Sequence, residues 1–299
     1  MEAPLVIGLD VGGTKILSGL VDREGNVVSE VETPSPDGSE EGVLAALDAA
    51  VEAHLGPRVA AIGYGIPANL ERGTGRILNA MNLPLDDVDL VSRSHERFGL
   101  PVGVENDGSV ATLAEWRCGA GRGTSNLVML TLGTGVGGGV VIDGRLFRGW
   151  AELGHVVVQE GGETCTCGGR GHLEMLASGS VADRIAVELY GADADAHTLI
   201  ERATAGDDRA QDGLARIGRS LGAAIGSLAN VFDPELVVIG GGFGIAAGDL
   251  VLDPAREAAR AEAVPPANRG IRIVPAELGS DAGLVGAGLV GFEALDGVR

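Results

Sequence analysis

The sequence predicts an α/β protein made of two similar halves that face a cleft. A strand, a glycine turn, a second strand and a tight turn occupy residues 6–22, and the same order returns in residues 128–144. Short apolar runs of strand length also alternate with segments of helical periodicity, which is typical of α/β proteins. Internal duplication of one supersecondary unit accounts for the repeated pattern.

Composition excludes several classes of protein. The 299 residues include 22 Lys and Arg against 42 Asp and Glu, a formal net charge of −20. This charge argues against a nucleic-acid partner, which needs clustered cations, and against adhesion to an anionic membrane. Glycine, at 50 residues, is more than twice its ordinary share of ~7%. Because glycine serves where backbone approaches another group closely, its clusters are candidate functional regions.

The expected location is the cytoplasm. No apolar run approaches the ~20 residues that a membrane-spanning helix needs. The chain reaches Asp10 without a basic N-terminal segment, so no signal peptide is expected. Three cysteines, two of them at Cys165 and Cys167, do not make a disulfide framework.

Hydrophobic periodicity and turn residues place the elements of the first half. Apolar runs predict strands over residues 4–10, 16–21, 26–33, 59–66 and 101–105. After Ser39, four apolar residues at four-residue spacing predict a helix that Gly56-Pro57 ends. A second helix is expected over residues 108–118.

The second half repeats this order. We expect a strand over residues 126–132, a glycine turn over 133–139, a strand over 140–142 and a hairpin turn at 143–144. A long helix, a strand over 235–239, a glycine turn at 240–242 and a terminal helix from Asp281 follow. The predicted lobes are a small one, residues 1–115, and a larger one, residues 116–299, whose terminal helix can pack back on the first lobe.

Three glycine turns that follow strands predict phosphate binding, because their backbone N–H groups can point at an anion. None matches the P-loop, and the G-x-G-x-x-G run at residues 133–138 lacks the helix that a dinucleotide site requires, which argues against a nicotinamide oxidoreductase. Asp10 stands just before the first turn, where a carboxylate can hold Mg²⁺ or its waters.

Several motifs occur in an order that resembles the ROK family of sugar kinases, and most closely its bacterial glucokinases. They are Asp10-x-Gly12-Gly13-Thr14-Lys15, Glu105-Asn106-Asp107, Leu132-Gly133-Thr134-Gly135-x-Gly137-Gly138-Gly139, Glu152-Leu-Gly-His155 and Cys165-x-Cys167-Gly168-x-x-Gly171-x-x-Glu174. The resemblance implies an actin-like, duplicated ribonuclease-H-type fold with its active site between the lobes. It also implies ATP as donor, Mg²⁺, and a homodimer or homotetramer.

The resemblance assigns roles residue by residue. Asp107 corresponds to the catalytic base, which orients the sugar hydroxyl and accepts its proton; the Asn106-Asp107-Gly108 run also suits a helix N-cap. The implied substrate-binding residues are Asn82, Asn106, Asp107, Glu152, His155 and Glu174. The implied nucleotide-binding residues are Asp10, Gly12, Gly13, Thr14, Lys15, Thr134, Gly135, Gly241 and Gly242. The stretch from Phe243 to Gly248 departs from the family pattern.

A zinc site is expected in the cysteine loop. His155, Cys165, Cys167 and His172 form a set of four nitrogen and sulfur ligands, the type found in structural zinc sites. The family usually carries cysteine where His172 stands, so this chain would use two cysteines and two histidines, or lose one ligand. The zinc would cross-link a loop too rich in glycine to hold His155 and Glu174 by packing.

The implied function is ATP-dependent phosphorylation of a hexose at its 6-hydroxyl, most directly glucose to glucose 6-phosphate. N-acetylglucosamine, N-acetylmannosamine, fructose or allose as substrate, and polyphosphate as donor, remain open within this class. A different alternative is a sugar-responsive transcriptional regulator lacking its DNA-binding domain, since the family includes regulators. The early phosphate strand and the acidic charge argue against it.

Overall fold

The computed structural model describes residues 3–36, 38–80 and 82–297. The chain forms two compact units. The first unit holds the chain up to Cys118, the segment from Asp281 onward and the three residues Arg148–Trp150. The second unit holds Gly119–Phe147 and Ala151–Ser280.

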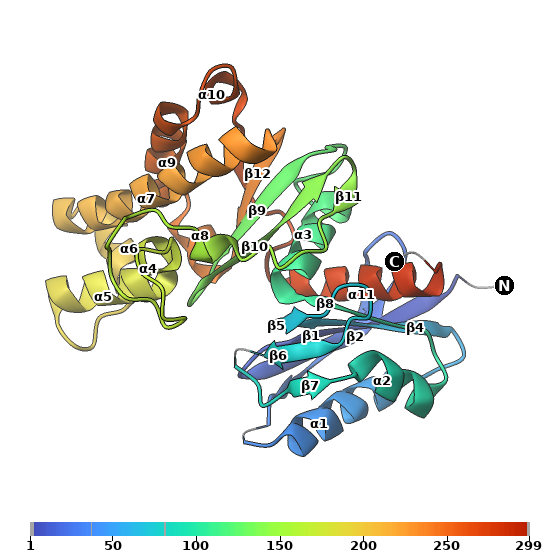
Figure 1. Cartoon of the computed structure of the whole chain (residues 1–299). Coiled ribbons are helices and arrows are strands. Elements are labelled where there is room, and N and C mark those ends of the chain that lie inside the picture. The colour runs from blue at the N-terminus through green and yellow to red at the C-terminus, as the bar shows by residue number, and fades with distance from the viewer. Residues whose placement is uncertain (1–2, 37, 81, 298–299) are drawn as a thin grey trace. The chain divides into compact units, whose positions relative to one another are not determined.

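Each unit is built on a five-stranded sheet, and the two sheets have the same strand order and directions (Figure 1). In the first sheet, ordered β3-β2-β1-β4-β8, the first three strands are antiparallel neighbours and β4 and β8 run parallel to β1. In the second sheet, β11-β10-β9-β12-β13, the corresponding pairs have the same directions. The predicted α/β fold with duplicated halves is therefore confirmed.

The strands of the two sheets have the following bounds. Those of the first are β1 (Leu5–Val11), β2 (Lys15–Val21), β3 (Val27–Pro34), β4 (Val59–Ile66) and β8 (Val102–Asn106). Those of the second are β9 (Leu127–Leu132), β10 (Val136–Ile142), β11 (Arg145–Leu146), β12 (Leu236–Gly240) and β13 (Ile273–Pro275). The sequence did not predict a further three-stranded sheet, made of β5 (Ala68–Leu70), β6 (Ile77–Ala80) and β7 (Asp86–Val88).

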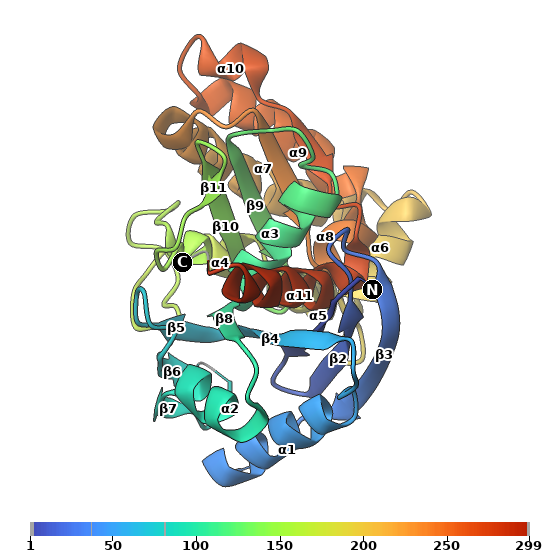
Figure 2. The ribbon, with the colours of Figure 1, turned by 90° about the vertical axis from the view of Figure 1, so that its right-hand side faces the viewer.

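Helices cover both faces of the first sheet (Figure 2). Helices α1 (Glu40–Glu52) and α2 (Leu90–Phe98) pack on one face, over a core that includes Ile7, Leu9 and Tyr64. On the other face lies α11 (Ala282–Leu295), which packs along α3 (Asp107–Cys118) and buries Phe292 against Val6 and Ala61. The predicted terminal helix is thus an element of the first unit.

A row of glycines brings α11 close to the first sheet. Gly19, Gly8, Gly63 and Gly103 are neighbours across four adjacent strands. A Cβ atom added at Gly8 would lie 2.6 Å from the carbonyl oxygen of Leu284, and one at Gly63 would overlap the carbonyl of Ala287. Many of the excess glycines therefore permit close backbone approach, as the composition predicted, but to a helix and not to a ligand.

In the second unit, glycines also allow two helices to pack closely. Helix α7 (Asp208–Phe232) packs along α9 (Asp249–Glu262). Gly218, Gly222 and Gly226, spaced four residues apart on α7, face the backbone of α9, and this spacing puts them on one side of the helix. The other helices of this unit are α4 (Glu174–Ala177), α5 (Gly179–Tyr190), α6 (Ala196–Thr204), α8 (Gly242–Ala247) and α10 (Ala267–Gly270).

Most element boundaries lie within one residue of the prediction, but those of α1 and β10 differ by three residues or more. Helix α1 ends at Glu52, so Leu55 lies beyond the helix and is 48% exposed. It therefore does not belong to the buried face of the helix, although the sequence predicted that it would. Strand β10 begins at Val136, so the glycines at 137–139 belong to a strand and not to the turn. A side chain at Gly138 would overlap the carbonyl oxygen of Met129, which explains why glycine is needed inside this strand.

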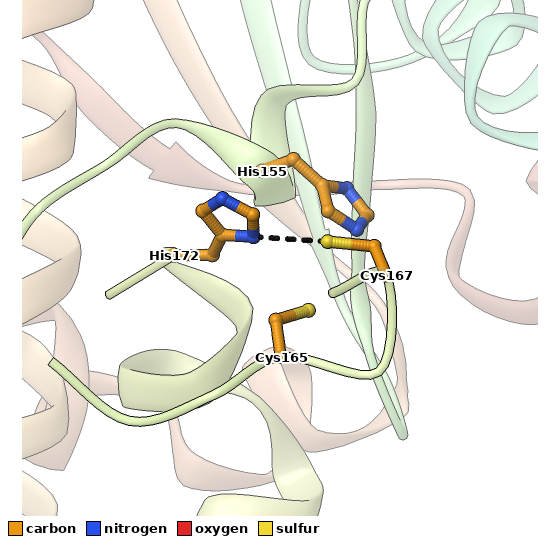
Figure 3. A group of neighbouring side chains, drawn as sticks. All are labelled: His155, Cys165, Cys167 and His172. Carbon is orange, nitrogen blue, oxygen red and sulfur yellow. Dashed lines mark hydrogen bonds between the residues drawn. The ribbon is translucent and has the colours of Figure 1, made fainter. Parts of the chain in front are cut away.

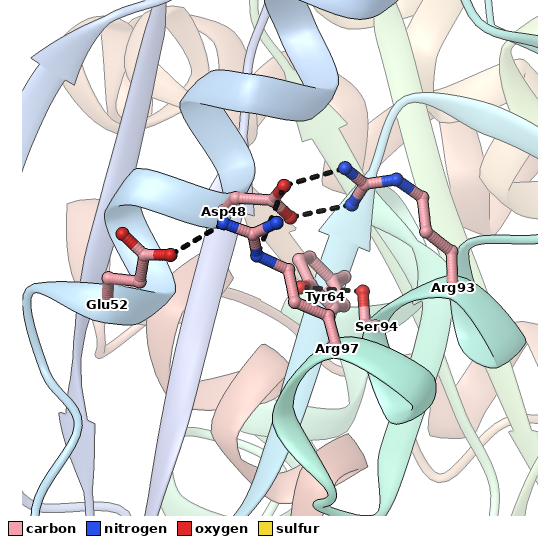
Figure 4. A network of polar contacts seen from close by, with 6 residues as sticks. All are labelled: Asp48, Glu52, Tyr64, Arg93, Ser94 and Arg97. Atoms are coloured by element: carbon pink, nitrogen blue, oxygen red, sulfur yellow. Dashed lines mark hydrogen bonds and ion pairs between the residues drawn. The ribbon is translucent and has the colours of Figure 1, made fainter.

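An ion-pair network around the buried Asp48 ties α1 to α2 (Figure 4). Arg93 donates two hydrogen bonds of 2.6 Å to the carboxylate of Asp48, which is only 6% exposed. Arg97 lies 3.4 Å from the same carboxylate and donates to Glu52 at 2.7 Å. This arrangement compensates the buried charge of Asp48 and fixes the spacing of the two helices.

No helix within the described ranges is long and apolar enough to cross a membrane.

Candidate functional site

In the first unit, two carboxylates and the start of two helices come together. Asp10 is the penultimate residue of β1, and Asp107 opens α3 directly after β8. The carboxylate of Asp10 lies against Gly283 in the first turn of α11, where a side chain would overlap it. Burial, with a smaller contribution from the charge of Asp107, raises the pKa of Asp10 to about 6, and Lys15 opposes the rise. This carboxylate is poised for a cation partner.

The first glycine turn differs from a simple phosphate cradle. The N–H of Gly12 donates to the carbonyl of Lys15 at 2.8 Å, which closes the turn. The ammonium group of Lys15 lies 2.6 Å from Glu32 on the neighbouring strand β3. Asn82 packs against Gly13, since a Cβ there would lie 3.2 Å from the Cβ of Asn82. Lys15 must therefore exchange partners before it can meet a phosphate.

Asp107 and Asn106 stand at the carboxyl end of β8, where the sequence predicted them. The side-chain oxygen of Asn106 accepts hydrogen bonds from the N–H groups of Gly108 and Ser109, at 2.9 and 3.3 Å, so Asn106 caps α3. Asp107 accepts the N–H of Gly108 at 2.9 Å. The residue is accessible to solvent, but the surrounding protein desolvates its carboxyl and raises its pKa, while that hydrogen bond lowers it.

In the second unit, a carboxylate occupies the second glycine turn. Glu174 accepts the N–H of Val136 at 3.0 Å, and a side chain at Gly135 would overlap the carboxylate. The N–H of Gly133 closes the turn on the carbonyl of Gly135, at 3.0 Å. Ser180, in the first turn of α5, donates to the carbonyl of Thr134 at 2.8 Å. Glu174, a predicted sugar-binding residue, thus lies against Gly135, a predicted nucleotide-binding residue.

The third glycine turn lies against the second. Gly241 has φ +81°, and a side chain there would overlap the backbone of Leu132 at the end of β9. Gly242 begins α8, and a Cβ at this position would meet nothing within 4 Å. The second and third predicted nucleotide turns are therefore neighbours on the second sheet.

The four predicted zinc ligands form one cluster (Figure 3). One donor atom from each of His155, Cys165, Cys167 and His172 lies within 4.8 Å of all the others. The Nδ1 atom of His172 is 3.4 Å from the sulfur of Cys167, and the two imidazole rings are 5.2 Å apart. The set fits a tetrahedral zinc ion, whose N and S ligands lie ~2.0–2.3 Å from the metal, after a modest contraction.

Backbone contacts, and not long helices or strands, hold the chain around this cluster. Val157 bridges to His172, and the N–H of Cys165 donates to the carbonyl of Gly169 at 2.8 Å. The buried Nδ1 of His155 has no hydrogen-bond partner among the described residues and lies 3.4 Å from the Glu152 carboxylate. A metal-bound histidine has one further nitrogen for a polar partner, so with the other nitrogen on zinc the Nδ1 of His155 can serve either Glu152 or a sugar hydroxyl at one time.

The sequence analysis missed one polar group near Asp107. Arg148 lies 2.7 Å from the buried carboxylate of Glu105 on β8 and also contacts Glu293 on α11. Neither Arg148 nor Glu293 stands in a motif, and they are 145 residues apart. The charged residue Glu105 within an otherwise apolar strand was the one available signal that a cation would be found nearby.

Comparison with known proteins places this geometry in a family. The model of the ROK family matches residues 6–291. The chain belongs to the ROK family. It is 36% identical to the glucokinase of Streptomyces coelicolor, over 95% of the chain and 96% of that protein. It is 34% identical to the N-acetylmannosamine kinase of Shigella flexneri, over 95% of the chain and 97% of that protein.

A solved structure agrees with this assignment. The crystal structure of a ROK family glucokinase from Streptomyces griseus, in complex with glucose and AMPPNP, matches with a TM-score of 0.83 and 36% identity. The match covers 97% of this chain and 99% of that one. In sequence and fold the chain is a glucokinase-like sugar kinase of the ROK family.

Proposed function

We propose that this ROK protein transfers the γ-phosphoryl group of ATP to the 6-hydroxyl of a hexose, with glucose as the preferred acceptor. The observation that carries the proposal is the pair of neighbouring carboxylates in the first unit, Asp107 at the start of α3 and Asp10 near the end of β1, which are close enough for the charge of Asp107 to raise the pKa of Asp10. Phosphoryl transfer needs a carboxylate to position the hydroxyl and a second one for the metal that accompanies the phosphates.

In the proposed reaction Asp107 orients the 6-hydroxyl and accepts its proton. A bond forms between that oxygen and the γ-phosphorus, the bond to the β–γ bridging oxygen breaks, and ADP leaves with the released electron pair. Asn106 binds the sugar while it caps α3. Asp10 holds Mg²⁺ directly or through water, and the ion neutralises charge on the phosphates when bound.

The second unit supplies further proposed contacts, beside those of Asn82 and the turn at residues 12–15 in the first unit. Glu152, His155 and Glu174 bind sugar hydroxyls, which pair well with carboxylate and imidazole groups. The turns at Thr134-Gly135 and Gly241-Gly242 contact the nucleotide. Structural zinc, held by His155, Cys165, Cys167 and His172, keeps the loop that carries these sugar contacts in one conformation.

A sugar panel tests this proposal. Purified protein with Mg²⁺ is assayed for ADP release and sugar phosphate on glucose, N-acetylmannosamine, N-acetylglucosamine, fructose and allose, with polyphosphate replacing ATP in a parallel series. Glucose with ATP should give the highest kcat/KM. The relative that phosphorylates N-acetylmannosamine makes that sugar the main competitor. A preference for N-acetylmannosamine would change the proposed substrate but keep the proposed reaction. Absence of turnover with every combination of sugar and phosphoryl donor would refute the kinase proposal.

Asp107→Asn serves as the matched chemical control. The substitution keeps the shape of the side chain and removes its ability to accept a proton, so turnover should fall by about 10²–10⁴-fold. Glucose affinity, measured by calorimetry, should change less than about threefold, because the amide still binds the hydroxyl. Light scattering on the same samples reports whether the protein forms the proposed homodimer or homotetramer.

A further inference from the structure

Arg148 joins two carboxylates from separate elements of the first unit. One guanidinium nitrogen donates to Glu105 on β8 at 2.7 Å, and the other donates to Glu293 on α11. The three residues Arg148–Trp150 belong to the first unit, although the chain on both sides belongs to the second. The chain therefore brings this arginine to the strand that ends at Asn106.

The Glu105 carboxylate depends on this arginine. The residue is 8% exposed, and burial raises the pKa of its carboxyl, while Arg148 and the Asn106 N–H lower it. Its second oxygen accepts the backbone N–H of Asn106 at 3.0 Å. A buried carboxylate is stable only when it is paired and hydrogen-bonded, so Arg148 and the Asn106 backbone together compensate the burial of Glu105 and hold its carboxyl group in place.

The contacts continue to the reacting end of the strand. Asn106 holds Gly108 and Ser109 through its side-chain oxygen and donates to the carbonyl of Ala68 at 3.3 Å. Arg148, Glu105, Asn106 and Glu293 all line one cavity of about 480 Å³. Because packing is absent on the cavity side, the position of Asn106 there depends on polar contacts.

We propose that Arg148 is a positioning residue for sugar phosphorylation. Through Glu105 it sets the backbone at Asn106 and hence the direction of the Asp107 carboxylate, and through Glu293 it anchors that strand end to α11. The proposal rests on the proposed function. It predicts that Arg148 acts on kcat beyond its effect on stability, since a displacement of ~1 Å at a reacting group can cost about 10²-fold.

Two other arginines of the first unit provide a matched comparison. Arg23 makes a two-bond pair, 2.7 Å and 2.7 Å, with Asp296 at the end of α11, the helix that also carries Glu293. Arg93 makes the buried pair with Asp48 between α1 and α2. Both pairs lie outside the contacts that reach Asn106, so both should act on stability alone.

The experiment compares Arg148→Met with Arg23→Met for kcat, both KM values and thermal midpoint. Arg148→Met should lower kcat at least about tenfold and leave the KM for ATP within about twofold. Arg23→Met should leave kcat within about twofold. Arg148→Lys keeps the charge but cannot reach both carboxylates, so it should fold normally and give an intermediate kcat.

The double variant Arg148→Met with Glu105→Gln separates positioning from charge compensation. It removes the unpaired buried charge, so its thermal midpoint should recover, while kcat should stay at least about fivefold low because the anchor to α11 is gone. Recovery of kcat together with stability would overturn the proposal. An unchanged kcat in both Arg148→Lys and Arg148→Met would also overturn the positioning proposal and leave the kinase proposal intact. Absence of activity on every sugar in the unsubstituted protein would overturn both proposals.

Discussion

The two glycine turns of the duplicated sheets follow strands with the same pairing, but the carboxylate beside each turn comes from a different part of the chain. The last residue pair of the first hairpin is Val11 with Ile16, and that of the second is Leu132 with Val136. Asp10 in the first sheet therefore corresponds to Thr131 in the second. Laying residues 6–22 over 128–144 without a gap instead pairs Asp10 with Leu132, one residue away from the register that the strand pairing gives.

The difference lies in where the negative charge comes from. In the first turn, Asp10 supplies it from the strand itself, in a desolvated position that suits a metal ion. In the second, the strand offers a hydroxyl, and Glu174 brings a carboxylate from the chain that follows the cysteine loop. The two sheets thus share one strand plan, whereas the first turn carries the carboxylate of the proposed metal site and the second is tied to the loop that carries the candidate zinc ligands.

The strongest test of this difference substitutes each of the two corresponding side chains in turn. Asp10→Asn should lower kcat/KM with ATP at least about 10²-fold, because the metal loses its carboxylate. Thr131→Val, the corresponding change in the second sheet, should lower it less than about fivefold. Steady-state kinetics over a range of Mg²⁺ concentrations measures both. Equal effects from the two variants would contradict the assignment of the metal to the first turn.

The same Asp10 variant should be more stable than wild type in Mg²⁺-free buffer. Since the folded pKa of about 6 exceeds the ordinary value of 3.8, the folded protein binds more protons between those values, and stability falls as pH rises through that window. Asp10→Asn should therefore gain up to about 3 kcal/mol at pH 7.5 and nothing below pH ~3.8. Denaturant unfolding at several pH values provides the measurement.

Glycines that hold backbones together should be distinguishable from glycines in open loops. Gly63→Ala places a methyl group on the Ala287 carbonyl of α11, and neither backbone can move away, so the cost should be about 3 kcal/mol or more. Gly56→Ala, whose added Cβ meets nothing within 4 Å, is the control and should change stability little. A thermal midpoint unchanged by Gly63→Ala would contradict the packing described for α11.

Zinc removal should affect the second turn and spare the first. Wild-type protein should contain about one zinc per chain, and Cys165→Ser should lose it, while Cys118→Ser should keep it. Hydrogen exchange should then rise across the segment from Glu152 to Glu174 and stay unchanged at residues 10–15. Metal content well below one zinc per chain in freshly purified wild type would exclude the zinc site.

The smallest expected effect concerns the contact between Glu174 and Val136. Glu174→Ala leaves a backbone N–H without its acceptor and should cost about 1–2 kcal/mol. Glu174→Gln keeps an acceptor at the same distance and should cost less than half of that, while sugar affinity falls in both variants. Denaturant unfolding and glucose calorimetry separate the two roles. Equal stability of both variants would show that the contact contributes nothing to holding the turn.

Much of the site could be predicted from sequence because its signals are local. A strand followed by glycine, an acid at a strand end, and histidine and cysteine at ligand spacing each depend on a few neighbouring residues. Asp10 lies near the end of β1, Asp107 directly follows β8, and the four candidate zinc ligands form one cluster. The family resemblance added the roles of Asn106 and the sugar-binding residues, which spacing alone left open.

Other features depend on residues that are far apart in the chain. The pairing of Arg148 with Glu105 and Glu293, and of Lys15 with Glu32, follows from strand and helix positions that no short window of sequence contains. The composition shows an excess of glycine, and the motifs explain part of it. Another part meets α11 or α9, because only a residue without a side chain lets two backbones approach so closely, and tertiary structure alone decides where that happens.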